Sequence, residues 1–175
     1  MSRILEVPAG ALVLLIGPSG SGKTTFAARH FAPTEVLSSD AMRAMVADDP
    51  AEQRATDDAF RLLHLALELR LRRRRLTVVD ATNVEAWARG QLLDIAARCR
   101  RPAAAVVLDV PLETCLERNE RRRDRHPPPA AIRRQQHSLH DSLPGLHREG
   151  FAAVHHLRSE NEVDDARIER IAGGG

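Results

Sequence analysis

An octapeptide near the N-terminus, GPSGSGKT from Gly17 to Thr24, has the residue types and spacing of a phosphate-binding loop. In the pattern G-x-x-x-x-G-K-[ST], backbone N–H groups surround phosphate oxygens, the lysine reaches the terminal phosphates and the last hydroxyl binds Mg²⁺. Lys23 is also the only lysine of the chain, so every other residue among its 26 lysines and arginines is arginine. A compact ammonium therefore stands where a planar guanidinium would crowd the loop.

The neighbouring sequence favours a functional loop over a glycine-rich turn that binds nothing. Residues 12–16 form an apolar run typical of a buried strand, and a helix is predicted over residues 22–30. Strand, loop and helix in this order place the N–H groups of a helix N-terminus against phosphate. We therefore predict that ATP or another nucleoside triphosphate binds here with Mg²⁺, and that Thr24 holds the metal. The residues predicted to bind the nucleotide are Gly17, Ser19, Gly20, Ser21, Gly22, Lys23, Thr24 and Thr25.

Asp40 follows a second short strand-like segment, residues 36–39. In an open parallel sheet the carboxyl ends of the strands border the ligand crevice, so a carboxylate here could accept the proton of an attacking hydroxyl. Asp40 equally fits the N-cap of the helix that follows it, and the sequence leaves both roles open. Arg43, one helical turn later, could hold a second phosphate or simply face solvent.

Asp80 ends a third strand-like segment, residues 77–80, whose β-branched residues are typical of a buried strand. A carboxylate at this point resembles the acidic residue that holds Mg²⁺ or its waters in phosphate-binding-loop proteins. The alternative is a cap or turn held by the side chains of Asp80 and Asn83. The sequence leaves the roles of both residues open.

Another candidate group consists of three arginines. Two belong to a predicted helix over residues 111–123, and the third lies in the segment that follows it. Arg118 and Arg122 are four residues apart and would share a helix face, with Arg125 one turn further along. A short helical lid, about residues 111–126, could bring them over the triphosphate to stabilise charge in the transition state. The alternative is a solvated helix whose arginines pair with the nearby carboxylates of Glu117, Glu120 and Asp124.

Strands that alternate with helices position these residues. Continuous apolar strands separated by helices indicate an α/β phosphate-binding-loop fold, a parallel sheet sandwiched by helices with a small helical lid. A chain of 175 residues fits one domain, residues 1–175. The polar and acidic residues after Ser159 contain no predicted element. The expected strands are residues 12–16, 36–39, 77–80, 104–110 and 153–157, and the other expected helices are residues 60–74, 85–100 and 130–140.

Composition narrows the range of functions. Hydrophobic residues make up 43% of the chain, no apolar run is long enough to cross a membrane and no signal peptide is recognisable, so we expect a cytoplasmic protein without a membrane partner. The net charge of +2 and the few aromatic residues argue against a long base-stacking surface. Arginines cluster at residues 72–75 and 98–101, and those at 72–75 are expected to stabilise a helix C-terminus.

Taken together, the motifs resemble the N-terminal kinase module of bacterial polynucleotide kinase-phosphatases, which are enzymes of RNA repair. The resemblance covers about residues 10–158. It depends on the phosphate-binding loop and on five further segments, which are FAPTEV at residues 31–36, Ser-Ser-Asp-x-x-Arg at 38–43, LTVVDATN at 76–83, Glu-Arg-Asn at 117–119 and Arg-Glu-Gly-Phe at 148–151.

The resemblance implies an ATP-dependent kinase that transfers the γ-phosphate to the 5′-hydroxyl end of RNA or DNA, on a sheet of 2-3-1-4-5 strand order. It implies that Lys23 and Thr24 hold the triphosphate and Mg²⁺. Asp40 would be the general base, and Arg43 would grip the phosphate beside the acceptor nucleoside. The expected catalytic residues are Lys23, Asp40 and Arg122. The donor would be clamped by the lid arginines Arg118, Arg122 and Arg125.

The chain departs from this resemblance in two ways. Full-length bacterial members continue into phosphatase and ligase domains, so the chain corresponds either to a kinase domain of a longer parent or to a stand-alone kinase. The run Pro127-Pro128-Pro129 stands where acceptor contacts are expected and leaves the acceptor side open. Two other functions remain as alternatives, a kinase for a small metabolite or nucleoside and a nucleotide-binding switch with little phosphotransfer.

Overall fold

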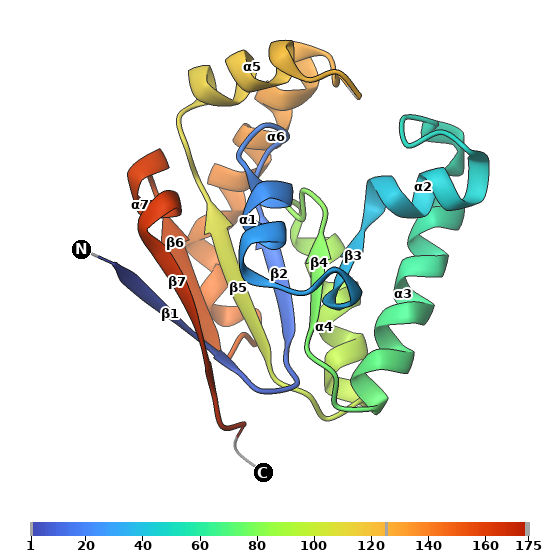
Figure 1. Ribbon diagram of the computed structural model, residues 1–175, viewed down its shortest axis with the longest axis vertical. Helices are drawn as coiled ribbons and strands as arrows, with labels where there is room; N and C mark the ends of the chain where they lie inside the picture. Colours follow the sequence, from blue (N-terminus) through green and yellow to red (C-terminus); the bar gives the residue numbers. More distant parts are fainter. Residues whose placement is uncertain (1, 125, 174–175) are drawn as a thin grey trace.

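Five parallel strands form the main sheet within the described part of the chain, in the order β3-β4-β2-β5-β6 (Figure 1). The structure, a computed structural model, describes residues 2–124 and 126–173. Counted from β2, this order is the 2-3-1-4-5 arrangement that the resemblance implied, so the prediction is confirmed. The strands are β2 (Leu12–Ile16), β3 (Val36–Ser38), β4 (Thr77–Asp80), β5 (Ala103–Leu108) and β6 (Ala153–Leu157).

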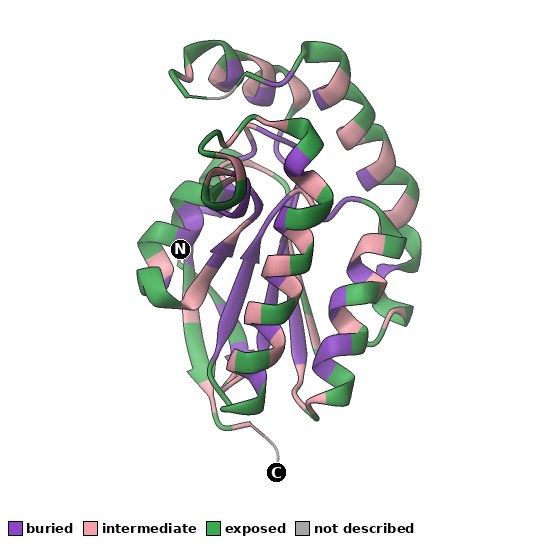
Figure 2. Cartoon of the chain, turned by 90° about the vertical axis from the view of Figure 1, so that its right-hand side faces the viewer, coloured by how far each residue is buried: buried purple, intermediate pink, exposed green. Residues whose placement is uncertain are grey.

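The central strands are apolar because both of their faces are covered. All residues of β2 and β5 are buried, and the register places Leu14 between Val79 of β4 and Ala105 of β5. Figure 2 shows the buried residues concentrated in these strands and on the sides of the helices that face them. Parallel strands of this kind are continuous apolar runs, which explains why their segments were recognisable in the sequence.

Helices cover the sheet on both faces. α3, α4 and α6 pack against one face through residues such as Leu67, Leu92 and Leu139. α1 and α7 pack on the other face through Phe26 and Val163. The helices are α1 (Lys23–His30), α2 (Ser39–Ala47), α3 (Thr56–Arg72), α4 (Ala86–Arg98), α5 (Leu112–Arg121), α6 (Pro129–Ser142) and α7 (Glu160–Asp165), and 3₁₀ turns span Pro33–Glu35, Gln53–Ala55 and Leu143–Arg148.

A second, two-stranded parallel sheet lies beside the main sheet and was not predicted. β1 (Arg3–Pro8) pairs with β7 (Ala166–Ile171), which brings segments from the two ends of the chain side by side (Figure 1). The expectation that the residues after Ser159 form no element is therefore wrong. In these strands only Leu5, Val7 and Ala166 are buried. A strand covered mainly on one face contains too few apolar residues to stand out from a polar tail.

The carboxyl ends of all five main-sheet strands lie at one edge, and the predicted site residues follow these ends. The phosphate-binding loop follows β2, Asp40 comes two residues after β3, and Asp80 is the last residue of β4. α5 extends above this edge, where the lid was expected (Figure 1). Within the described ranges, no helix combines the length and the apolar character that crossing a membrane requires.

Candidate active site

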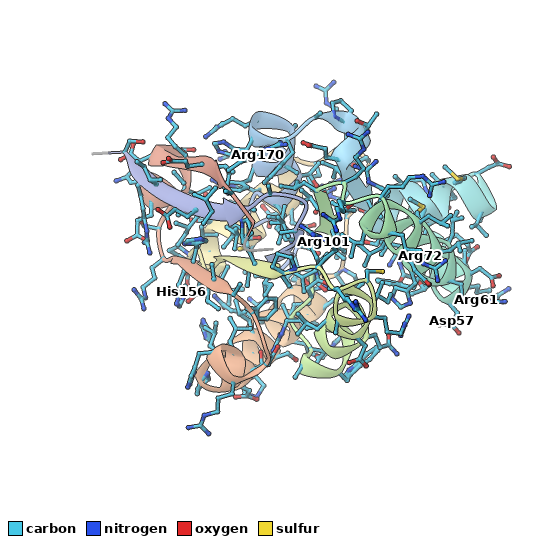
Figure 3. All side chains as sticks on the ribbon, turned by 90° about the horizontal axis from the view of Figure 1, so that it is seen from below. Asp57, Arg61, Arg72, Arg101, His156 and Arg170 are labelled. Carbon is cyan, nitrogen blue, oxygen red and sulfur yellow. The ribbon has the colours of Figure 1, made fainter. Side chains whose placement is uncertain are left out.

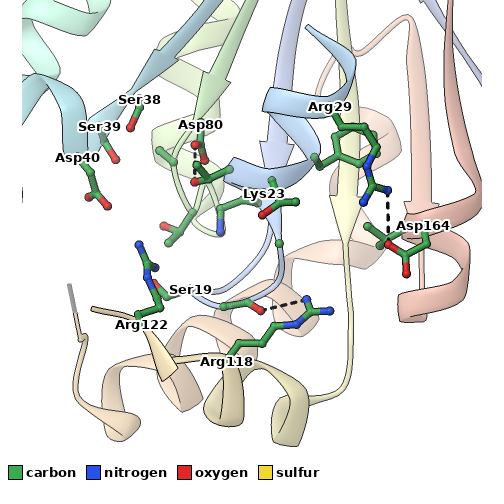
Figure 4. A pocket seen from close by; sticks show the side chains of 18 residues that line it. Ser19, Lys23, Arg29, Ser38, Ser39, Asp40, Asp80, Arg118, Arg122 and Asp164 are labelled. Atoms are coloured by element: carbon green, nitrogen blue, oxygen red, sulfur yellow. Dashed lines mark hydrogen bonds and ion pairs between the residues drawn. The ribbon is translucent and has the colours of Figure 1, made fainter. Parts of the chain in front are cut away.

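The phosphate-binding loop, the start of α2 and the lid line one open pocket of about 520 Å³ at the carboxyl edge of the sheet (Figure 4). Of the residues that the sequence predicted for the site, Gly17, Ser21 and Arg43 are buried and do not line this pocket. The predicted Arg125 lies outside the described residues. The predicted residues that line the pocket are Ser19, Gly20, Gly22, Lys23, Thr24, Thr25, Asp40, Arg118 and Arg122, and Asp80 lines it with them.

The backbone of the loop adopts a conformation that requires glycine at two positions. Gly20 and Gly22 have φ angles of +84° and +98°, in the left-handed region. A Cβ atom on Gly20 would collide with the backbone carbonyl of Cys115 in α5, and one on Gly22 would lie 3.3 Å from the Arg118 guanidinium. Successive N–H groups in such a winding, ahead of a helix N-terminus, form a concavity that binds anions. The loop therefore fits the phosphates of a nucleotide.

Lys23 is almost completely buried, and the loop itself holds its ammonium group. The ammonium donates hydrogen bonds to the carbonyl oxygens of Gly17 at 2.8 Å and Pro18 at 2.9 Å. Burial lowers the pKa of Lys23 from 10.5 to about 8, and the nearby Asp80 carboxylate opposes part of this shift. A bound polyphosphate would place negative charge beside the ammonium and raise its pKa again.

Thr24 and Asp80 meet at a point where a divalent cation would be held. The Thr24 hydroxyl donates a 2.7 Å hydrogen bond to the Asp80 carboxylate, whose residue is 6% exposed. A hydroxyl and a carboxylate next to a phosphate cradle are oxygen ligands of the kind that Mg²⁺ prefers. These residues therefore fit the metal, and their contact favours the functional role for Asp80 that the sequence left open.

The segment after Asp80 is fixed by buried polar contacts that the sequence did not reveal. Asn83 has a φ of +50° and donates a 2.8 Å hydrogen bond from Nδ2 to the carbonyl oxygen of Leu15. Arg89 of α4 is fully buried and donates from Nη1 to the Asn83 carbonyl oxygen at 2.9 Å. Its Nε and Nη2 bind the Glu149 carboxylate at 2.8 and 2.6 Å. Asn83 thus has a structural role, and Arg89 holds the loop that it belongs to.

Asp40 lines the pocket from the first turn of α2, and Arg43 holds its carboxylate. Arg43 Nη1 donates a 2.7 Å hydrogen bond to Asp40 Oδ1, and Arg43 Nε donates to Thr56 Oγ1 at 3.1 Å. The N-cap of α2 is Ser38, whose hydroxyl accepts a hydrogen bond from the Ala41 N–H group. The alternative in which Asp40 serves as the N-cap is therefore wrong.

The sequence suggested that Arg43 either holds a second phosphate or faces solvent, and its contacts in the structure differ from both. Its side chain is nearly buried and lies against Asp40 rather than in the lining of the described pocket. An arginine fixed at two points restrains the direction of the carboxylate that it binds. Direct contact of Arg43 with an acceptor phosphate stays a prediction.

The two described lid arginines reach the pocket in different ways. Arg118 of α5 donates hydrogen bonds to the Gly20 carbonyl oxygen at 3.4 Å and to Glu160 of α7 at 2.9 Å. Arg122 follows the end of α5 and binds Asp124 at 3.2 Å. Its backbone is extended, with φ −69° and ψ 143°, so the predicted shared helix face is wrong. Both guanidiniums nevertheless line the pocket (Figure 4).

Residues of α6 and α7 complete the site and were not recognised in the sequence. Gln135 of α6 accepts a 2.9 Å hydrogen bond through Oε1 from the Ser19 N–H group of the loop. α7 contributes Val163 and Asp164 to the pocket lining, and Asp164 pairs with Arg29 of α1 at 3.5 Å (Figure 4). The loop is therefore contacted from the lid side by α6 and bordered by the C-terminal helix.

Residues 12–142 match the model of a protein family described as an AAA domain. This range includes the phosphate-binding loop, Asp40, Asp80 and the lid, and it covers well over half of the chain. A comparison of the sequence with curated proteins finds no match. The segment that matches the family model is thus the one that contains the candidate site.

Solved structures of several kinases share this architecture. The gluconokinase of Sinorhizobium meliloti 1021 is 20% identical over 91% of this chain and 90% of that chain, with a TM-score of 0.55. The APS kinase of Mycobacterium tuberculosis, solved with AMPPNP and APS, is 20% identical over 91% of this chain and 94% of that chain, with a TM-score of 0.56. A chain of the Pnkp1/Rnl/Hen1 complex is 23% identical over 62% of this chain and 38% of that chain, with a TM-score of 0.54. At these identities the likeness establishes the P-loop kinase fold alone.

Proposed function

This chain belongs to the AAA-domain family, and from that premise we propose that it transfers the γ-phosphate of ATP or another nucleoside triphosphate to the 5′-hydroxyl end of RNA or DNA. One observation carries the proposal: Asp40 lines the same pocket as Lys23, Thr24 and Asp80. Groups suited to a triphosphate and a carboxylate suited to accept a proton are thus held in one cavity. Phosphoryl transfer to a hydroxyl group requires this combination.

In the proposed reaction the acceptor oxygen forms a bond to the γ-phosphorus, and the bond from that phosphorus to the bridging oxygen of the β-phosphate breaks. Asp40 takes the proton of the hydroxyl, and the nucleoside diphosphate leaves. Lys23, Arg118 and Arg122 stabilise the negative charge on the transferring group. A divalent cation held by Thr24 and Asp80 supplies charge neutralisation when bound.

Three features support a polynucleotide as the acceptor. The segments around Asp40, Asp80 and Arg118 resemble those of polynucleotide kinase modules. The pocket is open, so the acceptor hydroxyl can belong to a chain that continues beyond the cavity (Figure 4). The low content of aromatic residues, 3%, agrees with recognition of a terminus and a backbone rather than of stacked bases.

A small metabolite or nucleoside with a hydroxyl group is the second candidate acceptor. The match to a gluconokinase along nearly the whole of both chains favours it, although that likeness concerns the fold. For the polynucleotide acceptor we propose nucleic-acid repair in the cytoplasm as the setting. Phosphatase and ligase domains of a longer parent chain are the proposed partners, in line with the resemblance.

Transfer from γ-labelled ATP tests the proposal directly. The protein is incubated with Mg²⁺ and a 5′-hydroxyl oligonucleotide, with the same oligonucleotide carrying a 5′-phosphate as the matched control. Gluconate and a free nucleoside are run in parallel. We expect label on the 5′-hydroxyl strand alone. Label only on a small acceptor would support the second candidate, and nucleotide binding without transfer to any acceptor would support a nucleotide-dependent switch.

A further inference from the structure

The edge of the main sheet opposite the pocket has a group of arginines that the proposed active site does not use. Helices α3 and α4 both end at this edge (Figure 1), and each end is rich in arginine. Figure 3, seen from below, looks onto this edge and shows Arg101 near the central strands and Arg72 at α3. The group, termed the amino-edge arginines, consists of Arg72, Arg73, Arg74, Arg75, Arg98, Arg100 and Arg101.

Part of this group has a structural role. Arg73 Nη1 donates a 3.1 Å hydrogen bond to the carbonyl oxygen of Leu69 in the last turn of α3. Arg101 donates from Nε to Gly10 O at 3.0 Å and from Nη2 to Ala9 O at 2.7 Å, in the turn between β1 and β2. Arg73 therefore stabilises the C-terminus of α3, as was expected for the segment 72–75, and Arg101 holds the turn between β1 and β2.

The other guanidiniums of the group are exposed. Within the described residues, the side chains that form hydrogen bonds or ion pairs at this edge are those of Arg72, Arg73, Arg98 and Arg101, whereas Arg74, Arg75 and Arg100 form none. Glu68 pairs with Arg72 at 2.5 Å and with Arg98 at 4.0 Å. Glu6 is a further carboxylate at this edge, in a groove that Arg100 also lines. The edge therefore keeps an excess of positive charge, although the net charge of the chain is only +2.

Two of the exposed arginines occupy backbone positions at which glycine would make the fold more stable. Arg74 and Arg100 have φ angles of +56° and +53°. Each follows its helix in a Schellman motif, closed by the hydrogen bonds from Arg75 N–H to Arg70 O and from Arg101 N–H to Ala96 O. A side chain at this left-handed position lowers the stability of the fold. Capping of the helices does not explain why arginine rather than glycine is present there.

The ends of the two helices meet at the same turn. A Cβ atom on Gly10 would lie 2.7 Å from the Arg74 carbonyl oxygen and 2.8 Å from Arg101 Nη2. The ends of α3 and α4 therefore flank the turn between β1 and β2 on both sides. The amino-edge arginines thus form one surface and not two separate runs.

We propose that the amino-edge arginines bind the phosphate backbone of a nucleic-acid strand. Exposed guanidiniums without carboxylate partners are suited to phosphate groups, which accept paired hydrogen bonds from arginine. The segments 69–76 and 97–103 contain no aromatic residue, so the contacts are with phosphates and not with stacked bases. The surface lies at the other end of the strands from the pocket, so the proposal goes beyond the kinase function and does not depend on it.

The double variant Arg74→Gly/Arg100→Gly separates binding from a structural role. Because glycine suits both left-handed positions, the melting temperature should stay the same or rise. Binding of a fluorescent 30-nucleotide single-stranded RNA is measured by anisotropy over a series of salt concentrations. We expect about tenfold weaker binding at low salt and a salt slope smaller by about 1.4, as the loss of two phosphate contacts predicts. Arg75→Gln/Arg100→Gln, which leaves the position of Arg74 unchanged, should give the same loss.

Arg158→Gln/Arg167→Gln is the matched control, because both residues are exposed, lie outside this edge and carry the same total charge. It should retain most of the affinity. Unchanged affinity and salt slope in both amino-edge variants would overturn the proposal, and so would an equal loss in the control. Phosphorylation of a 5′-hydroxyl dinucleotide, which is too short to reach this edge, should be the same in the glycine variant and the wild type. A failure of the kinase proposal is therefore seen separately from a failure of this one.

Discussion

The two edges of the main sheet both collect charged residues, but they hold them differently. At the carboxyl edge Lys23 and Asp80 are buried, and each is fixed by hydrogen bonds. At the amino edge Arg74 and Arg100 extend into solvent. Catalysis requires groups at fixed positions, whereas attraction of a polyanion requires charge alone. The difference indicates that burial and positioning, rather than the density of charge, distinguish the candidate active site from the candidate binding surface.

Among changes to the residues that hold the donor, Lys23→Arg is expected to have the largest effect on activity. A guanidinium does not fit between the carbonyl groups of Gly17 and Pro18 that receive the ammonium. We expect kcat/KM in the phosphotransfer assay to fall by about 10²- to 10³-fold. Arg72→Lys at the amino edge is the matched control and should leave kcat/KM for a short acceptor unchanged. Wild-type activity in Lys23→Arg would show that the carboxyl edge, like the amino edge, requires only a positive charge and not an ammonium at a fixed position.

Arg89→Met is expected to give a large loss of stability. Arg89 is fully buried against Glu149, so its removal leaves a carboxylate largely buried without a partner. We expect the free energy of unfolding in urea to fall by about 3 to 5 kcal/mol. The pair of Arg72, which is exposed, and Glu68 provides the comparison, since Arg72→Met should cost less than about 1 kcal/mol. Equal losses in the two variants would show that burial of the arginine does not matter.

A third prediction concerns proton uptake on nucleotide binding. The pKa of Lys23 is about 8 in the free protein, below its ordinary value of 10.5, so at pH 9 most molecules have a neutral amine. Bound triphosphate raises this pKa, and binding should take up part of a proton. The triphosphate is itself fully ionised at pH 9 and contributes none. Calorimetry in two buffers of different ionisation enthalpy measures the uptake, and Lys23→Met should abolish it. Proton release in the wild type would show that Lys23 is already charged before the nucleotide binds.

The same shift predicts how stability depends on pH. Between about pH 8 and 10.5 the unfolded chain binds a proton at Lys23 more strongly than the folded chain does. The contribution of Lys23 to the free energy of unfolding should therefore rise with pH across this window. Below pH 8 the burial penalty of the charged amine is fully present. The difference between wild type and Lys23→Met, followed by urea unfolding, isolates this contribution.

The smallest effect is expected at the contact between the lid and α7. Glu160 accepts hydrogen bonds from Arg118 and from the Thr114 hydroxyl, both at 2.9 Å. The Arg118–Glu160 pair is substantially exposed, so its contribution is small and sensitive to salt. Glu160→Gln should free Arg118 for the donor phosphates and lower KM for ATP by about two- to threefold at low salt. A higher KM would mean that Glu160 instead directs Arg118 toward the donor.

Much of the fold could be predicted because its central strands are buried on both faces. β4 and β6 begin and end at the predicted residues, and the strand order agrees with the resemblance. The phosphate-binding loop was recognisable because its backbone requires glycine at fixed positions such as Gly20. Lys23, Thr24 and Asp40 line one pocket as expected because the carboxyl ends of parallel strands share an edge.

The remaining parts of the site depend on contacts between distant segments. The spacing of Gln135 with Ile132 and Leu139 indicates which face of α6 is buried, but not that this face contacts the loop. Arg89 could not be distinguished from the exposed arginines, because its partner Glu149 is 60 residues away. α7 was missed because its six residues include one buried apolar side chain.

In the proposed reaction, Asp40 accepts the proton of the acceptor hydroxyl in the pocket that binds the donor. Rapid-quench measurement of phosphoryl transfer to a 5′-hydroxyl oligonucleotide by Asp40→Asn tests this most directly, together with ATP binding by the same variant. We expect the transfer rate to fall by about 10²- to 10⁴-fold while the dissociation constant for ATP stays within about twofold. Transfer at the wild-type rate, or an equal loss of transfer and of ATP binding, would contradict this role of Asp40.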